Sequence, residues 1–198
     1  MLSSITPLGE RGRNNRFAVA AWFFFVGSTL GGAVTGLAAG GLGVLLVPEV
    51  PTVDGVVIVV LAIAGAAVDG RIAGLRLPTI TRQVDERWLH KYRSWVYGFG
   101  FGVQLGTGVA TIVSSSAVYL MVVAAVLTRS FVAGAVIGAV FGTIRGASIL
   151  LARRVSTYDE LRELHRRLAT NASRSVAADV VTQGMIGACA LVALVAVR

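Results

Sequence analysis

The amino-acid sequence predicts an all-α protein, a polytopic bundle of transmembrane helices. Residues 17–47 contain no charged side chain, and a helix of about twenty residues, at about 1.5 Å per residue, already crosses the hydrocarbon core of a bilayer. Of the 198 residues, 55% are hydrophobic and only 14% are charged, and the mean hydropathy is +0.76. These values exclude an ordinary soluble protein. We therefore expect one integral membrane domain over residues 1–198.

The apolar run at residues 17–47 is the first of about five expected spans. It is about twice as long as the apolar core of a secretory signal peptide, so we expect it to be retained. Four more apolar runs place the remaining spans at residues 55–77, 94–128, 130–152 and 176–197. The bilayer is therefore the first partner that the sequence predicts.

Basic residues mark the connections expected on the cytoplasmic side. Residues 78–93 and 153–175 are both rich in arginine, and Arg11, Arg13 and Arg16 precede the first span. Short basic loops stay in the cytoplasm, which explains the formal net charge of +8 without nucleic acid as a partner. We expect a multi-pass protein of the cell inner membrane, with its N-terminus in the cytoplasm.

The segment at residues 94–128 decides the number of spans, because it is too long for one straight crossing. Two crossings would place the basic connections at residues 78–93 and 153–175 on opposite sides of the membrane. The charge bias argues against that arrangement. We therefore favour a single tilted or broken crossing and five spans, with six as the alternative.

The second basic connection contains an amphipathic helix of its own. Ser156 and Thr157 stand three residues ahead of Asp159 and Glu160, which is the spacing of a capping box. The leucines that follow share one face and are flanked by arginines: Leu161, Leu164, Leu168, Arg162, Arg166 and Arg167. We expect an interfacial helix on the inner membrane surface. A docking helix for a partner protein has the same pattern.

Glycines recur at every fourth position in three of the expected spans. They are Gly32, Gly36 and Gly40; Gly98, Gly102 and Gly106; and Gly134, Gly138, Gly142 and Gly146. This spacing places them on one face of a helix, where the absence of side chains lets another backbone approach. We expect Gly-rich helix packing inside one bundle, with a homodimer seam as the alternative.

Four polar residues are the candidate transport site: Asp69, Gln104, Arg145 and Gln183. Under the five-span topology they lie at comparable depth, in the cytoplasmic half of the bilayer. Charges at this depth normally face the bundle interior or water, and Asp69 or Asp179 is close enough in depth to pair with Arg145. A salt bridge that only holds helices together is the structural alternative. The run GFGFGVQLGTG at residues 98–108 favours an interrupted helix beside a cavity.

The sequence offers no pattern typical of an enzyme, a metal site or a cofactor site. Cys189 is the single cysteine, so disulfides, a paired-thiol motif and a thiolate zinc site are excluded. His90 and His165 lie in separate polar segments, which disfavours a metal site. The expected spans hold no histidine, and the chain has no HExxH motif. We expect no catalytic activity, no metal and no cofactor.

Residues 73–113, AGLRLPTITRQVDERWLHKYRSWVYGFGFGVQLGTGVATIV, resemble the middle of the DsbD/CcdA membrane electron-transporter family, within the wider LysE-like group of small transporters. In that family a span ends in a Leu-Pro turn, a basic loop follows, and the next span opens with a Gly-Phe-rich run. Where the family carries a Pro-Cys pair, this chain has Gln104, Leu105, Gly106 and Thr107. The resemblance therefore implies a related scaffold without a thiol relay, which moves a solute instead.

These observations predict a small transporter or permease-like protein for a small solute or ion. The alternative is a non-catalytic accessory subunit of a membrane complex, which binds its partners through glycine faces and the inner-surface helix. A homo-oligomer and a membrane-protein partner both remain open.

Overall fold

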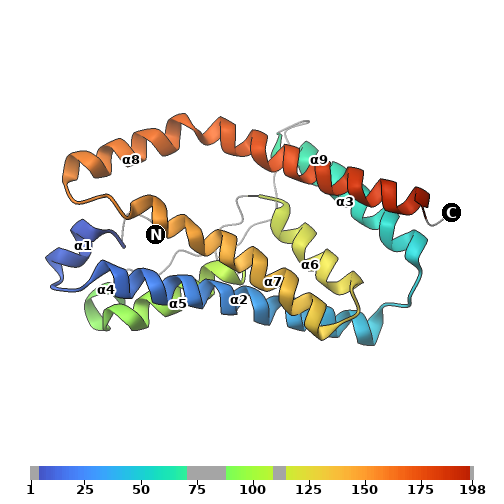
Figure 1. The fold of residues 1–198 in the computed structure, drawn as a ribbon, viewed down its shortest axis with the longest axis horizontal. Helices are drawn as coiled ribbons and strands as arrows, with labels where there is room; N and C mark the ends of the chain where they lie inside the picture. Colours follow the sequence, from blue (N-terminus) through green and yellow to red (C-terminus); the bar gives the residue numbers. More distant parts are fainter. Residues whose placement is uncertain (1–4, 71–87, 109–114, 197–198) are drawn as a thin grey trace.

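The computed structural model describes residues 5–70, 88–108 and 115–196, and every regular element in these ranges is helical (Figure 1). The elements are α1 (Pro7–Gly12), α2 (Phe17–Leu46), α3 (Pro51–Asp69), α4 (Trp88–Lys91), α5 (Ser94–Gly106), α6 (Ala117–Leu127), α7 (Phe131–Ala147), the 3-10 helix η2 (Ser148–Ala152), α8 (Tyr158–Thr170) and α9 (Ala172–Ala196). The predicted all-α class is confirmed.

Four of the described helical segments are long and apolar enough to cross a bilayer. They are Phe17–Leu46, Thr52–Asp69, Phe131–Ala152 and Ala172–Val195. Each falls on one of the predicted spans, although the last part of the second span, residues 71–77, lies outside the described residues. The membrane character predicted from composition is therefore supported, and the total number of spans stays a prediction.

Helix α2 is the element on which the others pack. It runs unbroken until Val47, whose backbone is extended because Pro48 follows it. On one side α7 lies antiparallel to α2, and a Cβ atom on Gly36 would meet the carbonyl oxygen of Gly134. On the other side α5 lies parallel to α2, and a Cβ atom on Gly98 would meet the carbonyl oxygen of Ala20. Close backbone approach at glycines holds these three helices together.

Helices α5 and α6 run in the same direction along α2. Gly106, at the end of α5, lies against Ser28, whereas Val126, at the end of α6, lies against Gly43. The two helices therefore follow each other along the bundle and do not fold back as a hairpin (Figure 1). This direction supports the prediction of one broken crossing over residues 94–128, of which residues 109–114 lie outside the described part.

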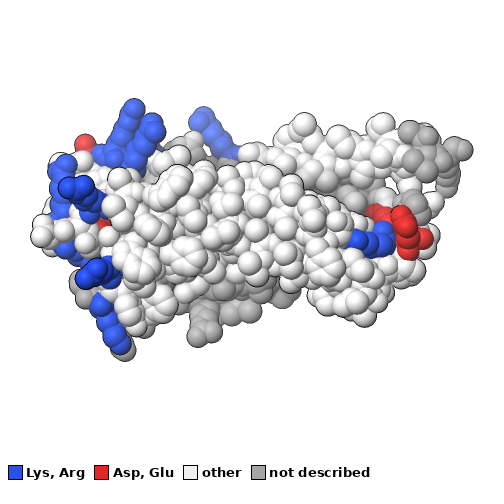
Figure 2. All heavy atoms as spheres, turned by 60° about the horizontal axis from the view of Figure 1, so that its bottom comes forward, with Lys and Arg blue, Asp and Glu red and all other residues white. Residues whose placement is uncertain are grey.

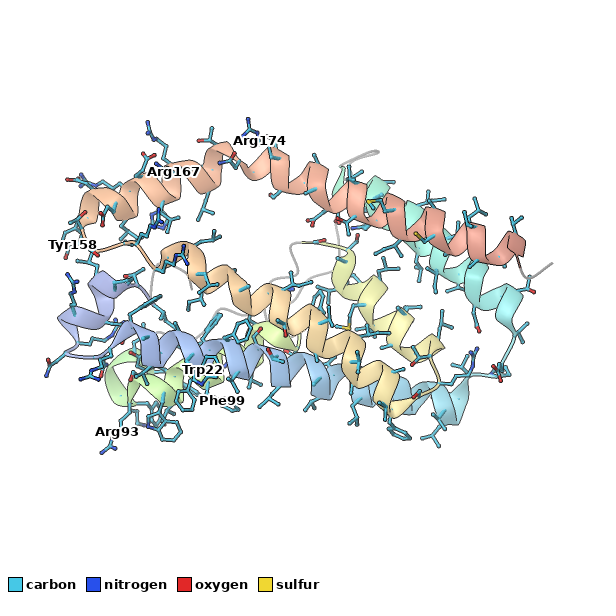
Figure 3. The ribbon with its side chains drawn as sticks, viewed as in Figure 1. Trp22, Arg93, Phe99, Tyr158, Arg167 and Arg174 are labelled. Atoms are coloured by element: carbon cyan, nitrogen blue, oxygen red, sulfur yellow. The ribbon has the colours of Figure 1, made fainter. Side chains whose placement is uncertain are left out.

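Charged residues gather at the two ends of the molecule (Figure 2). Lysine and arginine side chains cover the end formed by α1, α4 and the start of α8 (Figures 1 and 2). At the opposite end, Arg129 Nη2 forms an ion pair with Asp54 Oδ1 at 2.7 Å. Residues 88–93 and the start of α8 thus share one end of the bundle, whereas Arg174 lies farther along the molecule (Figure 3).

An aromatic cluster lies beside the basic end, where Trp22 and Phe99 project outward close to Arg93 (Figure 3). Trp22 and Trp95 are exposed, and the ring of Trp95 lies 5.9 Å from that of Phe23. Exposed tryptophan at one depth is typical of the boundary between lipid tails and headgroups. This cluster marks where we expect the bilayer surface to lie.

The N-terminal segment is packed into the basic end. The carboxylate of Glu10 is fully buried and accepts hydrogen bonds from Tyr97 Oη and, at 2.6 Å, from Arg13 Nη2. The surrounding core contains Ile5, Ala20, Ala21, Phe24, Leu89, Tyr97, Phe101 and Ile149. The predicted spans did not anticipate this cluster, which anchors α1 to the start of α2 and to α5.

The capping box predicted at the start of α8 is present. The Thr157 side chain accepts from the Glu160 backbone N–H at 3.3 Å, and Glu160 Oε2 accepts from the Thr157 N–H at 3.0 Å. However, α8 leads into α9 along the length of the molecule and does not turn across its end (Figure 1). Only Asn171 separates the two helices. The placement of α8 flat on the membrane surface therefore stays a prediction that this direction does not support.

Candidate functional site

Asp69, at the end of α3, binds the start of α6. Both of its carboxylate oxygens lie 3.0 Å from the backbone nitrogen of Ser116, the N-cap residue of α6. Its Oδ2 also accepts from Ser116 Oγ at 2.8 Å and from Ser115 Oγ at 3.0 Å. A helix that begins inside a bundle exposes free N–H groups, and a negative charge is favourable there. Asp69 thus supplies an acceptor at the start of α6.

Gln183, on α9, completes a junction of three helices. Its Nε2 donates to Asp69 Oδ2 at 2.7 Å, and its Oε1 accepts from Ser116 Oγ at 3.0 Å. The side chain is only 1% exposed. Space for it comes from Gly65, because a Cβ atom there would lie 2.5 Å from Gln183 Oε1 and 2.6 Å from Ser116 Oγ. We call Asp69, Ser115, Ser116 and Gln183 the Asp69 junction.

Beside the junction lies a cavity of about 790 Å³ between α6, α7 and α9, which we call the α7–α9 cleft. Most of its lining is apolar, with Ile137, Val140, Phe141 and Ile144 on α7 and Ile186 on α9. Its polar lining residues are Ser115, Arg145, Ser148, Asp179, Thr182 and Gln183. A large apolar cavity with a few convergent polar groups is the usual form of a small-molecule site.

Arg145 and Asp179 face the cleft from different helices. The guanidinium of Arg145 lies 5.4 Å from the centre of the Phe141 ring, and within the described ranges no carboxylate lies within 4.0 Å of it. Asp179 lines the cleft together with Ser115. The predicted ion pair between Arg145 and Asp69 or Asp179 is therefore absent from the described residues. The Asp69 carboxylate instead accepts hydrogen bonds from four donors.

Three of the four predicted site residues come together, and the fourth does not. Arg145 and Gln183 both line the cleft, and Asp69 is hydrogen-bonded to Gln183. The side chain of Gln104 is not part of the lining, to which α5 contributes Leu105 instead. A neighbouring position on a helix points about 100° away, so a one-residue offset separates these two side chains.

Sequence reasoning did not assign Ser115, Ser116 and Thr182 to the site. The run of serines at residues 114–116 was a usable signal, because serine is a preferred N-cap and marks a helix start. Thr182 carries no such signal, and its position beside Gln183 follows only from the packing of α9.

Metal-ligating side chains are dispersed in the described part of the chain. No group of three or more His, Cys, Asp or Glu residues there is arranged to hold a metal ion. The Cys189 thiol is exposed on α9, away from the cleft lining.

Comparison with known proteins gives one informative similarity. The chain is 32% identical over 145 residues to the methylamine utilization protein MauF of Methylophilus methylotrophus, a match that covers 70% of this chain and 51% of that protein. The chain thus spans about half the length of this curated relative. No family model and no solved structure matches the chain.

Proposed function

We propose that this protein is a small permease-like membrane transporter whose solute binds in the α7–α9 cleft. One observation carries the proposal. Arg145 and Asp179, opposite in charge and at membrane depth, line the same cavity without forming an ion pair. A charge held inside a bilayer without a protein partner is costly, and it is normally found where water or a solute reaches it.

The interrupted crossing supports the same function. Transporter sites often lie where a helix is broken near the middle of the membrane, because freed backbone groups can then face a cavity. Here α5 and α6 both contribute to the cleft, through Leu105 and Val118, and Ser115 belongs to the junction and to the cleft lining. The weak resemblance of residues 73–113 to the DsbD/CcdA and LysE-like transporters points in the same direction.

We place the protein in the cell inner membrane, with the basic end of the bundle in the cytoplasm. This orientation follows from the positive-inside rule and from the shared location of the basic residues (Figure 2). The cleft then lies in the half of the bilayer nearer the cytoplasm, because Arg145 is near the end of α7 that leads to the basic connection.

Flux through purified protein in proteoliposomes tests this function. The tracers are radiolabelled methylammonium, chosen from the name of the relative, acetate, phosphoethanolamine, and a phospholipid with a fluorescent acyl chain. At least one tracer should enter faster than in empty liposomes. Arg145→Gln and Asp179→Asn should each lower that flux about tenfold, the effect of one lost charge-assisted contact.

Matched variants separate a loss of site chemistry from a general charge effect. Arg174→Gln and Asp159→Asn remove the same charges from exposed positions outside the cleft, so they should retain the wild-type flux. Wild-type protein that moves none of the four tracers, or cleft variants that move them as well as the controls do, would contradict the proposed transport.

An accessory subunit is the second candidate, and one feature favours it. Helix α8 has no buried residue, and among the described elements it packs appreciably only on α9. A free amphipathic helix is a common docking element. If this function is correct, crosslinking in gently solubilised membranes should attach a second protein to α8 in fixed proportion, and purified protein alone should move no tracer.

A further inference from the structure

We infer that the α7–α9 cleft binds a zwitterionic phospholipid of the phosphoethanolamine type, with its phosphate at Arg145 and its ammonium at Asp179. This inference names the substrate class of the transport site and rests on the proposed function. It follows from the charges on the two walls of the cleft, the apolar character of the lining, and the side from which a ligand can enter.

The α7 wall is suited to a phosphate. Arg145 lines the cavity and is held over the face of Phe141 at 5.4 Å. This cation–π contact fixes the guanidinium but leaves its N–H donors available. A guanidinium binds phosphate through two parallel hydrogen bonds, which makes arginine the preferred residue for this group. Ser148, one turn beyond Arg145 on the same side of the cleft, adds a hydroxyl donor.

The α9 wall is suited to an ammonium group. Asp179 lines the cleft on the same helix as Thr182 and Gln183. No lysine, arginine or histidine of the described chain forms an ion pair with Asp179, and an opposite charge beside a carboxylate favours its charged form. The oxygens of Asp69 already accept from the serines and Gln183, which leaves Asp179 as the acceptor that faces the cavity. An ammonium group, which only donates, matches it.

The remaining lining is suited to an acyl chain. Ile137, Val140 and Ile144 form a stripe along α7, and Val140 and Ile144 are 55% and 69% exposed on the molecular surface. In a bilayer that surface faces lipid tails, so a ligand reaches the cleft sideways from the membrane. The volume of about 790 Å³ lies in the range of about 300–1,000 Å³ that is typical of sites for ligands of drug size. A lipid headgroup with the first part of its chain fits this description, and a free ion does not use the apolar stripe.

Native mass spectrometry of the intact, delipidated protein tests the inference. The probes share the same acyl chains: phosphatidylethanolamine, the anionic phosphatidylglycerol and the uncharged diacylglycerol. Wild-type protein should retain phosphatidylethanolamine about tenfold better than either of the others, because only this lipid satisfies both charges. Arg145→Gln should weaken both phospholipids. Asp179→Asn should abolish the preference for phosphatidylethanolamine over phosphatidylglycerol, while Arg174→Gln and Asp159→Asn should preserve it.

Each other outcome overturns the inference. Equal or better binding of phosphatidylglycerol would identify an anion site in which Asp179 has no part. An unchanged lipid preference in Asp179→Asn would do the same. Competition by millimolar free phosphoethanolamine would identify a water-soluble zwitterion as the ligand. Failure here is distinct from failure of the transport function, because methylammonium, acetate or phosphoethanolamine would still move in proteoliposomes if only the lipid assignment were wrong.

Discussion

At the scale of single residues, the Asp69 carboxylate links three helices that are distant in sequence. It satisfies the backbone N–H of Ser116 where the broken crossing resumes, and it receives the side chain of Gln183 from α9. Buried polar groups are costly when they lose one partner, so this junction is a point where small changes have large effects. The arrangement also fixes one wall of the α7–α9 cleft, because Ser115 and Gln183 belong to both.

The fit around Gly65 leads to a sharp prediction for stability. Gly65→Ala introduces a methyl group into the space of Gln183 Oε1 and Ser116 Oγ, so we expect a loss of about 1–3 kcal/mol, as for other overpacked sites. Gly184→Ala is the matched control, because a Cβ atom there meets no heavy atom of the described chain within 4 Å. It should be neutral or should stabilise α9 by up to about 1 kcal/mol.

Thermal unfolding in one detergent, followed by circular dichroism, measures both variants. An unchanged midpoint for Gly65→Ala, or a larger loss in Gly184→Ala than in Gly65→Ala, would show that the junction is not packed as described.

The residue scale also shows the limit of sequence reasoning about the site. Asp69, Arg145 and Gln183 were predicted because polar residues in apolar runs are rare and visible without a structure. Their hydrogen-bond partners were not predicted. Asp69 bonds to Ser115 and Gln183, which are 46 and 114 residues away in the sequence, and such bonds depend on which helices pack side by side. Gln104 was assigned to the site only for its predicted depth in the membrane. The structure shows that the neighbouring Leu105 lines the cleft and that Gln104 does not.

At the scale of elements, helix starts and glycine faces follow closely from local sequence. The apolar runs mark α2, α3, α7 and α9, because a helix that crosses lipid needs about twenty consecutive, mainly apolar residues. The glycines of α2 and α7 meet each other at four-residue spacing. The direction of α8 could not be predicted, because it depends on the backbone of a single connecting residue, Asn171.

The start of α8 should depend on pH. The backbone N–H groups of Ser156 and Thr157 donate to Glu160 and lower its pKa below the ordinary 4.5. The pKa of Glu163 is also lowered, through hydrogen bonds from Arg167 and Arg166. A lowered folded-state pKa contributes stability that is present above pH 4.5 and is lost as the pH falls through the folded pKa. We therefore expect α8 to loosen below pH 4.5.

Hydrogen exchange of the α8 amides at pH 6.5 and pH 3.5, corrected for the intrinsic effect of pH, measures this change. Protection in wild-type protein should fall at the lower pH. Glu160→Gln should be less protected at pH 6.5 and should change less between the two values. Equal protection of wild-type protein at both pH values would contradict the role given to the two carboxylates.

At the scale of the whole molecule, the order of α5 and α6 along α2 determines the arrangement of the later helices. Because both helices run in the same direction along α2, the chain returns through α7 to the basic end before α8 begins (Figure 1). A hairpin in their place would reverse every later element and would separate Arg145 and Asp179 from Asp69. The α7–α9 cleft, the proposed transport and the lipid site all require this topology.

Labelling of single cysteines with a membrane-impermeant maleimide tests the topology most directly. In a Cys189→Ser background, Val50→Cys should react in cells whose outer membrane has been removed and whose inner membrane is intact. Tyr92→Cys and Arg154→Cys should react only after the inner membrane is opened. Reaction of Tyr92→Cys and Arg154→Cys from opposite sides of the membrane would contradict the single broken crossing.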